Sequence, residues 1–213
     1  MYTMAKGRTM PEYVSDIAFT GGVKAVQERL GSRNTYARME QSGGWQHTVN
    51  DDLRNFLAAR NSFYLGTATA DGQPYIQHRG GPNGFLKPID ERTLAFADFA
   101  GNQQYITMGN LDENDKAYIF VMDYAGRQRI KLWGRAEVIE DDPELVAKLA
   151  DPAYRSKPER AIVFHLEAWD INCPQHITRR FDEDDVVPKV RELQARVQVL
   201  ESELAAIKDS NPS

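Results

Sequence analysis

Residues 62–85 read SFYLGTATADGQPYIQHRGGPNGF, and this stretch decides the fold class. Both SFYLGTATA (62–70) and PYIQHRG (74–80) have the composition and the bounding turn residues of β-strands. The Asp71-Gly72 pair between them favours a tight turn, because glycine accepts a positive φ at little cost. The stretch therefore predicts an antiparallel β-hairpin.

Four more segments with strand character follow this hairpin. They are TLAFADF (93–99), KAYIFVMDY (116–124), RQRIKLWGRAEVIE (127–140) and RAIVFHLEAWDI (160–171). Their connections are mostly turns, with short helices predicted at 101–111 and 141–150, and Gly134 predicts a bulge or a sharp bend in its strand. An antiparallel meander of this size tends to close into a barrel. We therefore expect a mainly β, α+β fold built on a six-stranded antiparallel barrel.

The rest of the chain predicts helical appendages. Residues 1–48 are expected to form an N-terminal extension with one short helix, near 23–30, that ends at Gly31, followed by a loop over 32–47. Thr48 is placed to cap a helix over 49–60, whose apolar positions share one face. The barrel domain is then expected over 49–181, and a C-terminal helix and tail over 182–213.

The C-terminal segment carries a heptad pattern. Seven apolar residues follow one another at steps of 4, 3, 4, 3, 4 and 3: Val186, Val190, Leu193, Val197, Leu200, Leu204 and Ile207. Valine at a positions with leucine at d positions favours a two-stranded coiled coil. The alternative is one amphipathic helix packed on its own barrel, and the pattern alone leaves both open.

Composition argues against several classes of function. The net charge of −5 does not suggest the dense basic surface that nucleic acid requires. No apolar run approaches the roughly 18 residues of a membrane span, and the first residues lack the apolar core of a signal peptide. With one cysteine, Cys173, the sequence offers no internal disulfide and no multi-cysteine metal site. We therefore expect a cytoplasmic protein that binds no nucleic acid, no membrane and no metal.

Polar side chains on the hairpin form the first candidate binding site. Strand alternation puts Gln77 and Arg79 on one face and His78 on the other. Both Gln77 and Arg79 can donate hydrogen bonds to carbonyl or phosphate oxygens. Gly80 and Gly81 would let a ligand approach the backbone closely. The alternative is a polar strand end that runs into a flexible turn.

The Gly101-Asn102 turn and the helix predicted after it form a second candidate. Free N–H groups at a helix N-terminus attract an anion such as phosphate. Asn102, Gln103 and Gln104 add side-chain donors without charge. The alternative is an ordinary helix cap.

Two further groups of residues are candidates. Arg129, Lys131 and Trp133 share one face of the fifth strand, where they could contact an electron-rich anionic ring or form a solvated face. Cys173 and His176, in NCPQHI (172–177), are too few for a zinc site. His176 is the one candidate general acid.

In order and spacing, three segments resemble the pyridoxamine 5′-phosphate oxidase-like family of FMN-binding split barrels: DGQPYIQHRGGPNGF (71–85), TLAFADFAGNQQYITMGNL (93–111) and NCPQHI. The resemblance covers about residues 49–181. It implies a split barrel, non-covalent FMN, a small-molecule substrate, and a homodimer with the cofactor site at the subunit interface. It assigns cofactor contacts to Gln77, His78, Arg79, Gly80, Gly81, Asp98, Asn102, Gln103, Gln104 and Arg129. Together with Arg129, Lys131 is expected to stabilise negative charge on the reduced ring.

The sequence departs from the family pattern at the phosphate site. Asn102-Gln103-Gln104 stands where the oxidase has Ser-Arg-Lys, and Gln77 stands at a strand arginine, so Arg79 is the candidate compensating cation. Oxidation of pyridoxamine phosphate is therefore not the expected reaction. We expect an FMN-dependent oxidoreductase that transfers a hydride or electrons between NADH, NADPH or another donor and an unidentified small molecule. The alternatives are a non-catalytic flavin-binding or stress-related dimer, and a haem or deazaflavin enzyme on the same barrel.

Overall fold

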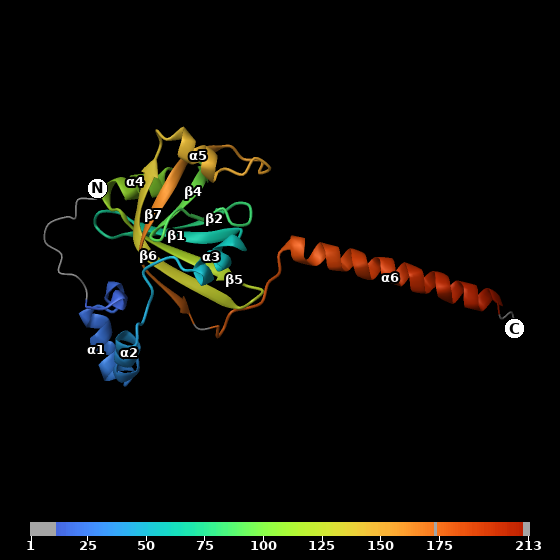
Figure 1. Cartoon of the computed structure of the whole chain (residues 1–213), viewed down its shortest axis with the longest axis horizontal. Coiled ribbons are helices and arrows are strands. Elements are labelled where there is room, and N and C mark those ends of the chain that lie inside the picture. The colour runs from blue at the N-terminus through green and yellow to red at the C-terminus, as the bar shows by residue number, and fades with distance from the viewer. Residues whose placement is uncertain (1–11, 173, 211–213) are drawn as a thin grey trace. The chain divides into compact units, whose positions relative to one another are not determined.

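The computed structural model describes residues 12–172 and 174–210, which form a seven-stranded sheet and flanking helices (Figure 1). The helices are η1 (Val14–Ile17, a 3-10 helix), α1 (Gly21–Arg29), α2 (Arg33–Gln41), α3 (Asp51–Ala58), α4 (Ile106–Glu113), α5 (Pro143–Leu149) and α6 (Glu183–Ser210). The strands are β1 (Ser62–Ala68), β2 (Pro74–Gly80), β3 (Lys87–Pro88), β4 (Thr93–Phe99), β5 (Lys116–Asp123), β6 (Gln128–Ile139) and β7 (Pro158–Asn172). The chain divides into two units, of which the first holds the sheet with the helices up to α5 and the second holds α6.

All neighbouring strands are antiparallel, in the order β2-β1-β5-β6-β7-β4-β3. The β1–β2 register pairs Thr67 with Tyr75 and Ser62 with Gly80, and Gly72 has a φ of 94°. The predicted hairpin and the four other predicted strands, which are β4, β5, β6 and β7, are therefore confirmed. The additional strand, β3, was not predicted, because two residues are too few to show a strand pattern.

The sheet curls around one apolar core. Phe63 on β1 meets Phe96 on β4 edge-on, with ring centroids 5.0 Å apart, although these strands are not neighbours in the ladder. Phe85, from the segment between β2 and β3, stacks on Phe63 at 5.2 Å. Leu53 and Leu57 of α3 join the same core. The expected split barrel is therefore confirmed, with α3 packed against its interior.

Gly134 marks a bulge in β6. The β6–β7 register shifts between Trp133 and Gly134, as its sequence position predicts. A methyl group on Gly134 would lie 2.1 Å from the carbonyl oxygen of His165 and 2.8 Å from the ring of Phe164. Only glycine therefore allows the two long strands to approach this closely while β6 bends around the core.

The prediction of a loop over 32–47 is wrong for residues 33–41, which form α2. Arg33 forms an ion pair with Glu40, whose side chain is almost fully buried, and donates to Gln27 Oε1 at 2.7 Å. The ion pair joins the two ends of α2, and the hydrogen bond to Gln27 joins α2 to α1. The loop begins after it, where Gly43 and Gly44 have φ values of 101° and 46°.

Two other helix starts differ from their predicted positions. Asn50, rather than Thr48, caps α3, because its side-chain oxygen accepts from the Leu53 N–H at 2.9 Å. The helix predicted from residue 101 begins only at Ile106. Tyr105 directly before it has a left-handed φ of 52°, which is incompatible with the first helical turn.

The C-terminal helix is confirmed as α6. Its seven heptad residues are between 42% and 66% exposed in the single chain. None of the helices in the described part of the chain has the length and hydropathy of a membrane span. The expected domain limits at 48/49 and 181/182 stay predictions.

Gly134→Ala tests the bulge. We expect the free energy of unfolding to fall by about 3 kcal/mol, since the new methyl group meets backbone and a packed ring. The measurement is urea unfolding followed by circular dichroism. Gly109→Ala is the control, because no atom lies within 4 Å of its new methyl group in α4, and we expect a gain of roughly 0.5–1 kcal/mol. Equal stability of Gly134→Ala and the wild type would contradict this geometry.

Candidate functional site

A polar cleft lies at the gap in the split barrel, where β2 and β4 approach without sharing backbone hydrogen bonds. It is lined by Tyr75, Gln77 and Arg79 of β2, Asp98 and Phe99 of β4, residues 101–108, and Glu159 and Arg160 of β7. Its volume is about 60 Å³. A single water requires roughly 10–15 Å³ on this kind of measure, so the cleft has room for a group of a few heavy atoms.

Asp98 holds two arginines at this cleft. Arg79 Nη1 donates to Asp98 Oδ1, and Arg160 Nε lies 3.8 Å from Asp98 Oδ2. The side chain of Arg79 is only 15% exposed, and those of Arg160 and Asp98 are each 10% exposed. Arg160 also pairs with Glu159. Buried charges of this kind require partners, so the network fixes both guanidinium groups in place.

One polar atom of this network is left without a partner. Arg79 Nε is buried and has no hydrogen-bond partner among the described residues. A buried N–H without a partner costs free energy, and such groups often face a ligand or water. Arg79 lines the cleft, so this unpartnered donor belongs to one of the side chains around it.

Neutral donors surround the arginines. Thr107 Oγ1 donates to Gln77 Oε1 at 2.9 Å, which leaves the Gln77 amide nitrogen as a donor. Asn102 Oδ1 accepts from the Gln104 N–H at 3.2 Å, forming a local turn. Gln103 and Tyr105 have φ values of 58° and 52°, a left-handed conformation that costs free energy in residues other than glycine and occurs in tight turns and at functional sites. Thus Asn102, Gln103 and Gln104 lie in a tight loop before α4 rather than in its first turn.

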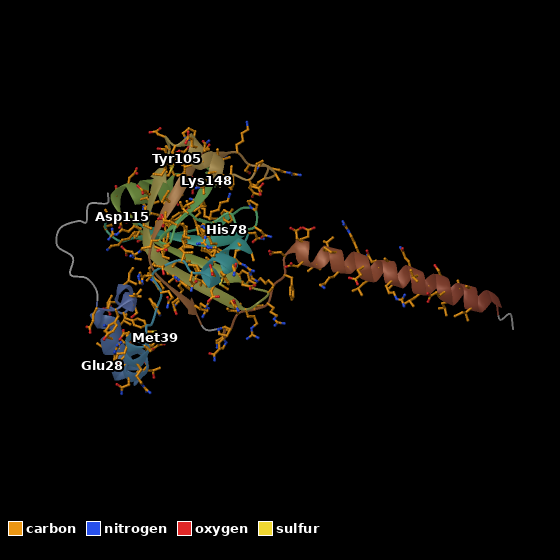
Figure 2. All side chains as sticks on the ribbon, in the orientation of Figure 1. Glu28, Met39, His78, Tyr105, Asp115 and Lys148 are labelled. Carbon is orange, nitrogen blue, oxygen red and sulfur yellow. The ribbon has the colours of Figure 1, made fainter. Side chains whose placement is uncertain are left out.

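Tyr105, which Figure 2 labels, directly precedes α4 and is one of the residues that line the cleft. The Arg160 guanidinium lies 5.7 Å from the centroid of its ring, within cation–π range. The ring is 53% exposed. It therefore presents an aromatic surface next to the buried charges.

Three predicted contacts on β2 do not line the cleft. His78 lies on the opposite face of the strand (Figure 2), where its ring meets Tyr64 edge-on at 5.6 Å. Gly80 and Gly81 follow at the end of the strand. A methyl group on Gly81 would lie 2.6 Å from the Phe85 ring, so packing explains the glycine there.

Lys131 and Arg129 lie on β6, outside the cleft. Lys131 Nζ pairs with Asp170 at 2.9 Å and lies 5.0 Å and 5.2 Å from the ring centroids of Trp45 and Trp133. These two rings stack at 4.5 Å. The Lys131 charge is therefore engaged by Asp170 of β7 and by two indole rings, of which Trp45 belongs to the N-terminal extension. Arg129 Nε is buried without a hydrogen-bond partner among the described residues.

Tyr118 belongs to the same aromatic cluster on β5 and β6. Its ring meets Trp133 edge-on at 5.2 Å. Burial raises the pKa of the Tyr118 phenol to about 12, while the charge of Arg129 opposes this rise and that of Asp170 adds to it. The neutral phenol is thus the form that the folded protein favours.

The remaining two predicted residues lie in the second unit of the chain or outside the described residues. His176 precedes α6 and has a φ of 62°, and its assignment as a general acid stays a prediction. Cys173 lies outside the described residues. Within the described ranges, no group of three or more His, Cys, Asp or Glu side chains is arranged to hold a metal ion.

Arg160, Thr107 and Tyr105 are cleft residues that the sequence did not reveal. Arg160 faces Asp98 because the β4–β7 register pairs these two residues. That register joins positions 62 residues apart in the chain, and strand alternation alone does not supply it. A search for an arginine opposite the one buried aspartate of β4 could have found it.

A split barrel with a polar cleft at its gap is the architecture of one family of cofactor-binding proteins, and the sequence matches that family. The profile described as pyridoxamine 5′-phosphate oxidase matches residues 49–173. The chain therefore belongs to the pyridoxamine 5′-phosphate oxidase family. A search of curated protein sequences finds no match.

Several solved structures are similar to this one. HupZ from Group A Streptococcus is 18% identical, with a TM-score of 0.49, covering 62% of this chain and 99% of that one. A protein related to general stress protein 26, from Clostridium acetobutylicum, is 16% identical, with a TM-score of 0.40 and coverage of 63% and 94%. A FAD-binding protein from Mesorhizobium loti is 16% identical, with a TM-score of 0.39 and coverage of 59% and 97%. The family assignment rests on the sequence match.

Tyr118→Phe tests the electrostatics of the aromatic cluster. Because the folded pKa of about 12 exceeds the ordinary value of 10.0, the native state retains a proton that the unfolded chain releases. The contribution of the protonated Tyr118 phenol to the free energy of unfolding is present below pH 10 and is lost as the pH rises towards 12. We therefore expect urea midpoints to fall less between these pH values in Tyr118→Phe than in the wild type. Tyr154→Phe, at an exposed tyrosine, should fall as the wild type does, and equal slopes for all three proteins would contradict the assignment.

Proposed function

We propose that the chain is an FMN-dependent oxidoreductase whose cleft binds the cofactor phosphate. The observation that carries this proposal is the pair of nearly buried arginines, Arg79 and Arg160, held beside a loop of neutral donors. The bound flavin would supply the hydride or electron transfer. The chain would supply position and electrostatics.

Arg160 supplies a positive charge that the phosphate-site positions of the sequence lack. The neutral run Asn102–Gln104 and Gln77 lack the cations of the oxidase pattern, whereas Arg160 brings a guanidinium to the same cleft from β7. Arginine binds phosphate oxygens through a planar set of donors, and both Arg79 and Arg160 line the cleft. Asp98 orients both guanidinium groups and offsets part of their charge.

The size of the cleft suggests where the rest of the cofactor would lie. A volume of about 60 Å³ suits a phosphate and excludes a flavin ring. The ring would therefore lie outside this cleft. We propose that a second copy of the chain covers it, so that the site lies at the interface of a homodimer.

The outer face of the sheet supports a homodimer. Tyr64, Phe120 and Tyr118 lie side by side on β1 and β5, and Ile76 beside them on β2 is 68% exposed. An apolar aromatic face of this kind is typical of a protein–protein interface. Arg129 and Lys131 lie on β6 at the edge of this face. In the homodimer, they would stabilise negative charge on the flavin ring that the partner subunit binds.

The electron donor and acceptor are proposed by chemical class. NADH or NADPH would reduce the flavin, in a reducing cytoplasm, and a small molecule would take up the electrons. A flavin carrier without turnover is the main alternative. A haem would find no histidine among the described residues that line the cleft.

Flavin titration tests the binding step. The wild-type protein should bind FMN and quench its fluorescence, and Arg160→Ala should weaken the affinity by roughly 10–100-fold, the worth of a charge-assisted hydrogen bond. Arg160→Lys should retain part of the affinity because it keeps the charge. Arg135→Ala is the matched control, since Arg135 is also ion-paired on the sheet, to Asp115 and Glu167, but lies outside the cleft. Failure of the wild type to bind FMN would overturn the proposal.

Anaerobic reduction separates an oxidoreductase from a carrier. We expect NADH or NADPH to bleach the visible absorbance of the bound flavin, and an added acceptor to restore it. Free FMN under the same conditions is the control. Bound flavin that neither nucleotide reduces would support the carrier instead.

A further inference from the structure

We propose that α6 pairs with α6 of a second copy of this chain as a parallel, in-register, two-stranded coiled coil. The seam defined by the seven heptad residues is the starting observation, because every one of them is exposed in the single chain. A helix with an apolar stripe takes most of its stability from the packing of that stripe. The 28 residues of α6 would otherwise present it to water.

The residues of the seam specify the number of strands. Val190, Val197 and Leu204 take a positions, and Val186, Leu193, Leu200 and Ile207 take d positions. The two central heptads, Val190–Leu193 and Val197–Leu200, combine a β-branched residue at a with leucine at d, which favours parallel dimers. Leu204 at a with Ile207 at d, at the end of the seam, has the opposite preference, and the central heptads decide the number of strands. Pro188, the one proline inside α6, takes an f position, on the side of the helix opposite the seam.

Charge complementarity identifies the partner as a second copy in parallel orientation. In a parallel pair, the residue at g faces the residue five places later, at e, in the other helix. Arg196 at g therefore faces Glu201 of the second copy, and symmetry forms this contact twice. The preceding pair, Lys189 and Gln194, carries only one charge, so no like charges meet there.

The seam is short, about three heptads, which is close to the minimum for a stable coiled coil. Pairing becomes more favourable when the two helices are already tethered, because the second contact is then intramolecular. The homodimer under the proposed function would supply that tether. The orientation and register of α6 are argued from α6 alone, so they are tested separately from flavin binding.

Disulfide trapping in the full-length chain tests orientation and register. Leu200→Cys, with Cys173→Ser to remove the native thiol, should form a disulfide between chains, because only a parallel in-register pair places residue 200 beside itself. Ser202→Cys, at an f position, is the matched control and should react roughly tenfold or more slowly, since its Cβ atoms lie too far apart. Val190→Cys at an a position is the second trapping variant, in case Leu200→Cys weakens the helix. Equal rates at 200 and 202, or no disulfide at either 200 or 190, would overturn the proposal. So would a disulfide that forms only when the 190 and 200 variants are mixed, which indicates an antiparallel pair.

Charge exchange tests the contact between Arg196 and Glu201 of the second copy, from which the parallel orientation is inferred. Arg196→Glu and Glu201→Arg should each slow trapping at residue 200, because each places like charges in contact twice. The combined exchange, Arg196→Glu with Glu201→Arg, should restore the wild-type rate, since it recreates the same contacts with the signs reversed. Glu192→Arg, at a c position away from the seam, is the control for a change of net charge. A combined variant slower than both single variants would contradict the parallel g–e contact.

Discussion

The contact between Asp98 and two arginines is the interaction on which both the barrel and the cleft depend. Strands β2 and β4 share no backbone hydrogen bonds, because β1, β5, β6 and β7 lie between them in the sheet. Side chains must therefore hold these two strands together across the gap. The Arg79–Asp98 ion pair spans this gap directly, and Arg160 reaches the same carboxylate from β7. Because these groups are nearly buried, removing the Asp98 carboxylate would leave the Arg79 guanidinium without its ion-pair partner, whereas Arg160 would still pair with Glu159. The same atoms that close the barrel therefore form the floor of the proposed phosphate site.

Polar contacts continue from this network into α4. Asn110 Nδ2 donates to Thr67 Oγ1 at 3.0 Å in a buried position, and Thr107 holds Gln77. These bonds fix α4 against β1 and β2. The strained loop before α4 is anchored on both sides, by β4 and by this helix. A ligand there would meet donors that are already in position, so binding would order few additional side chains.

Local sequence signals predicted the elements of the fold well, and long-range contacts explain where they did not. The Asp71-Gly72 turn and the Gly134 bulge were predictable because each depends on the backbone freedom of one glycine. The α2 helix was missed because its side-chain contacts are polar, within the helix between Arg33 and Glu40 and to Gln27 of α1, and apolar periodicity does not reveal such contacts. In the cleft, alternation correctly placed Gln77 and Arg79 on one face, whereas Arg160 depended on the register between β4 and β7. Likewise, no local pattern could show that Trp45 would cover Lys131, since the two are far apart in the chain.

The stack of Trp45 on Trp133 has an optical consequence. Two indole rings that lie 4.5 Å apart and only 17° from parallel are coupled transition dipoles. Their coupling should give a circular dichroism signal in the aromatic region that neither ring produces alone. One ring belongs to the N-terminal extension and the other to β6, so the signal would disappear if the extension left the barrel. The protein thus carries an intrinsic spectroscopic reporter of whether its first helices are docked.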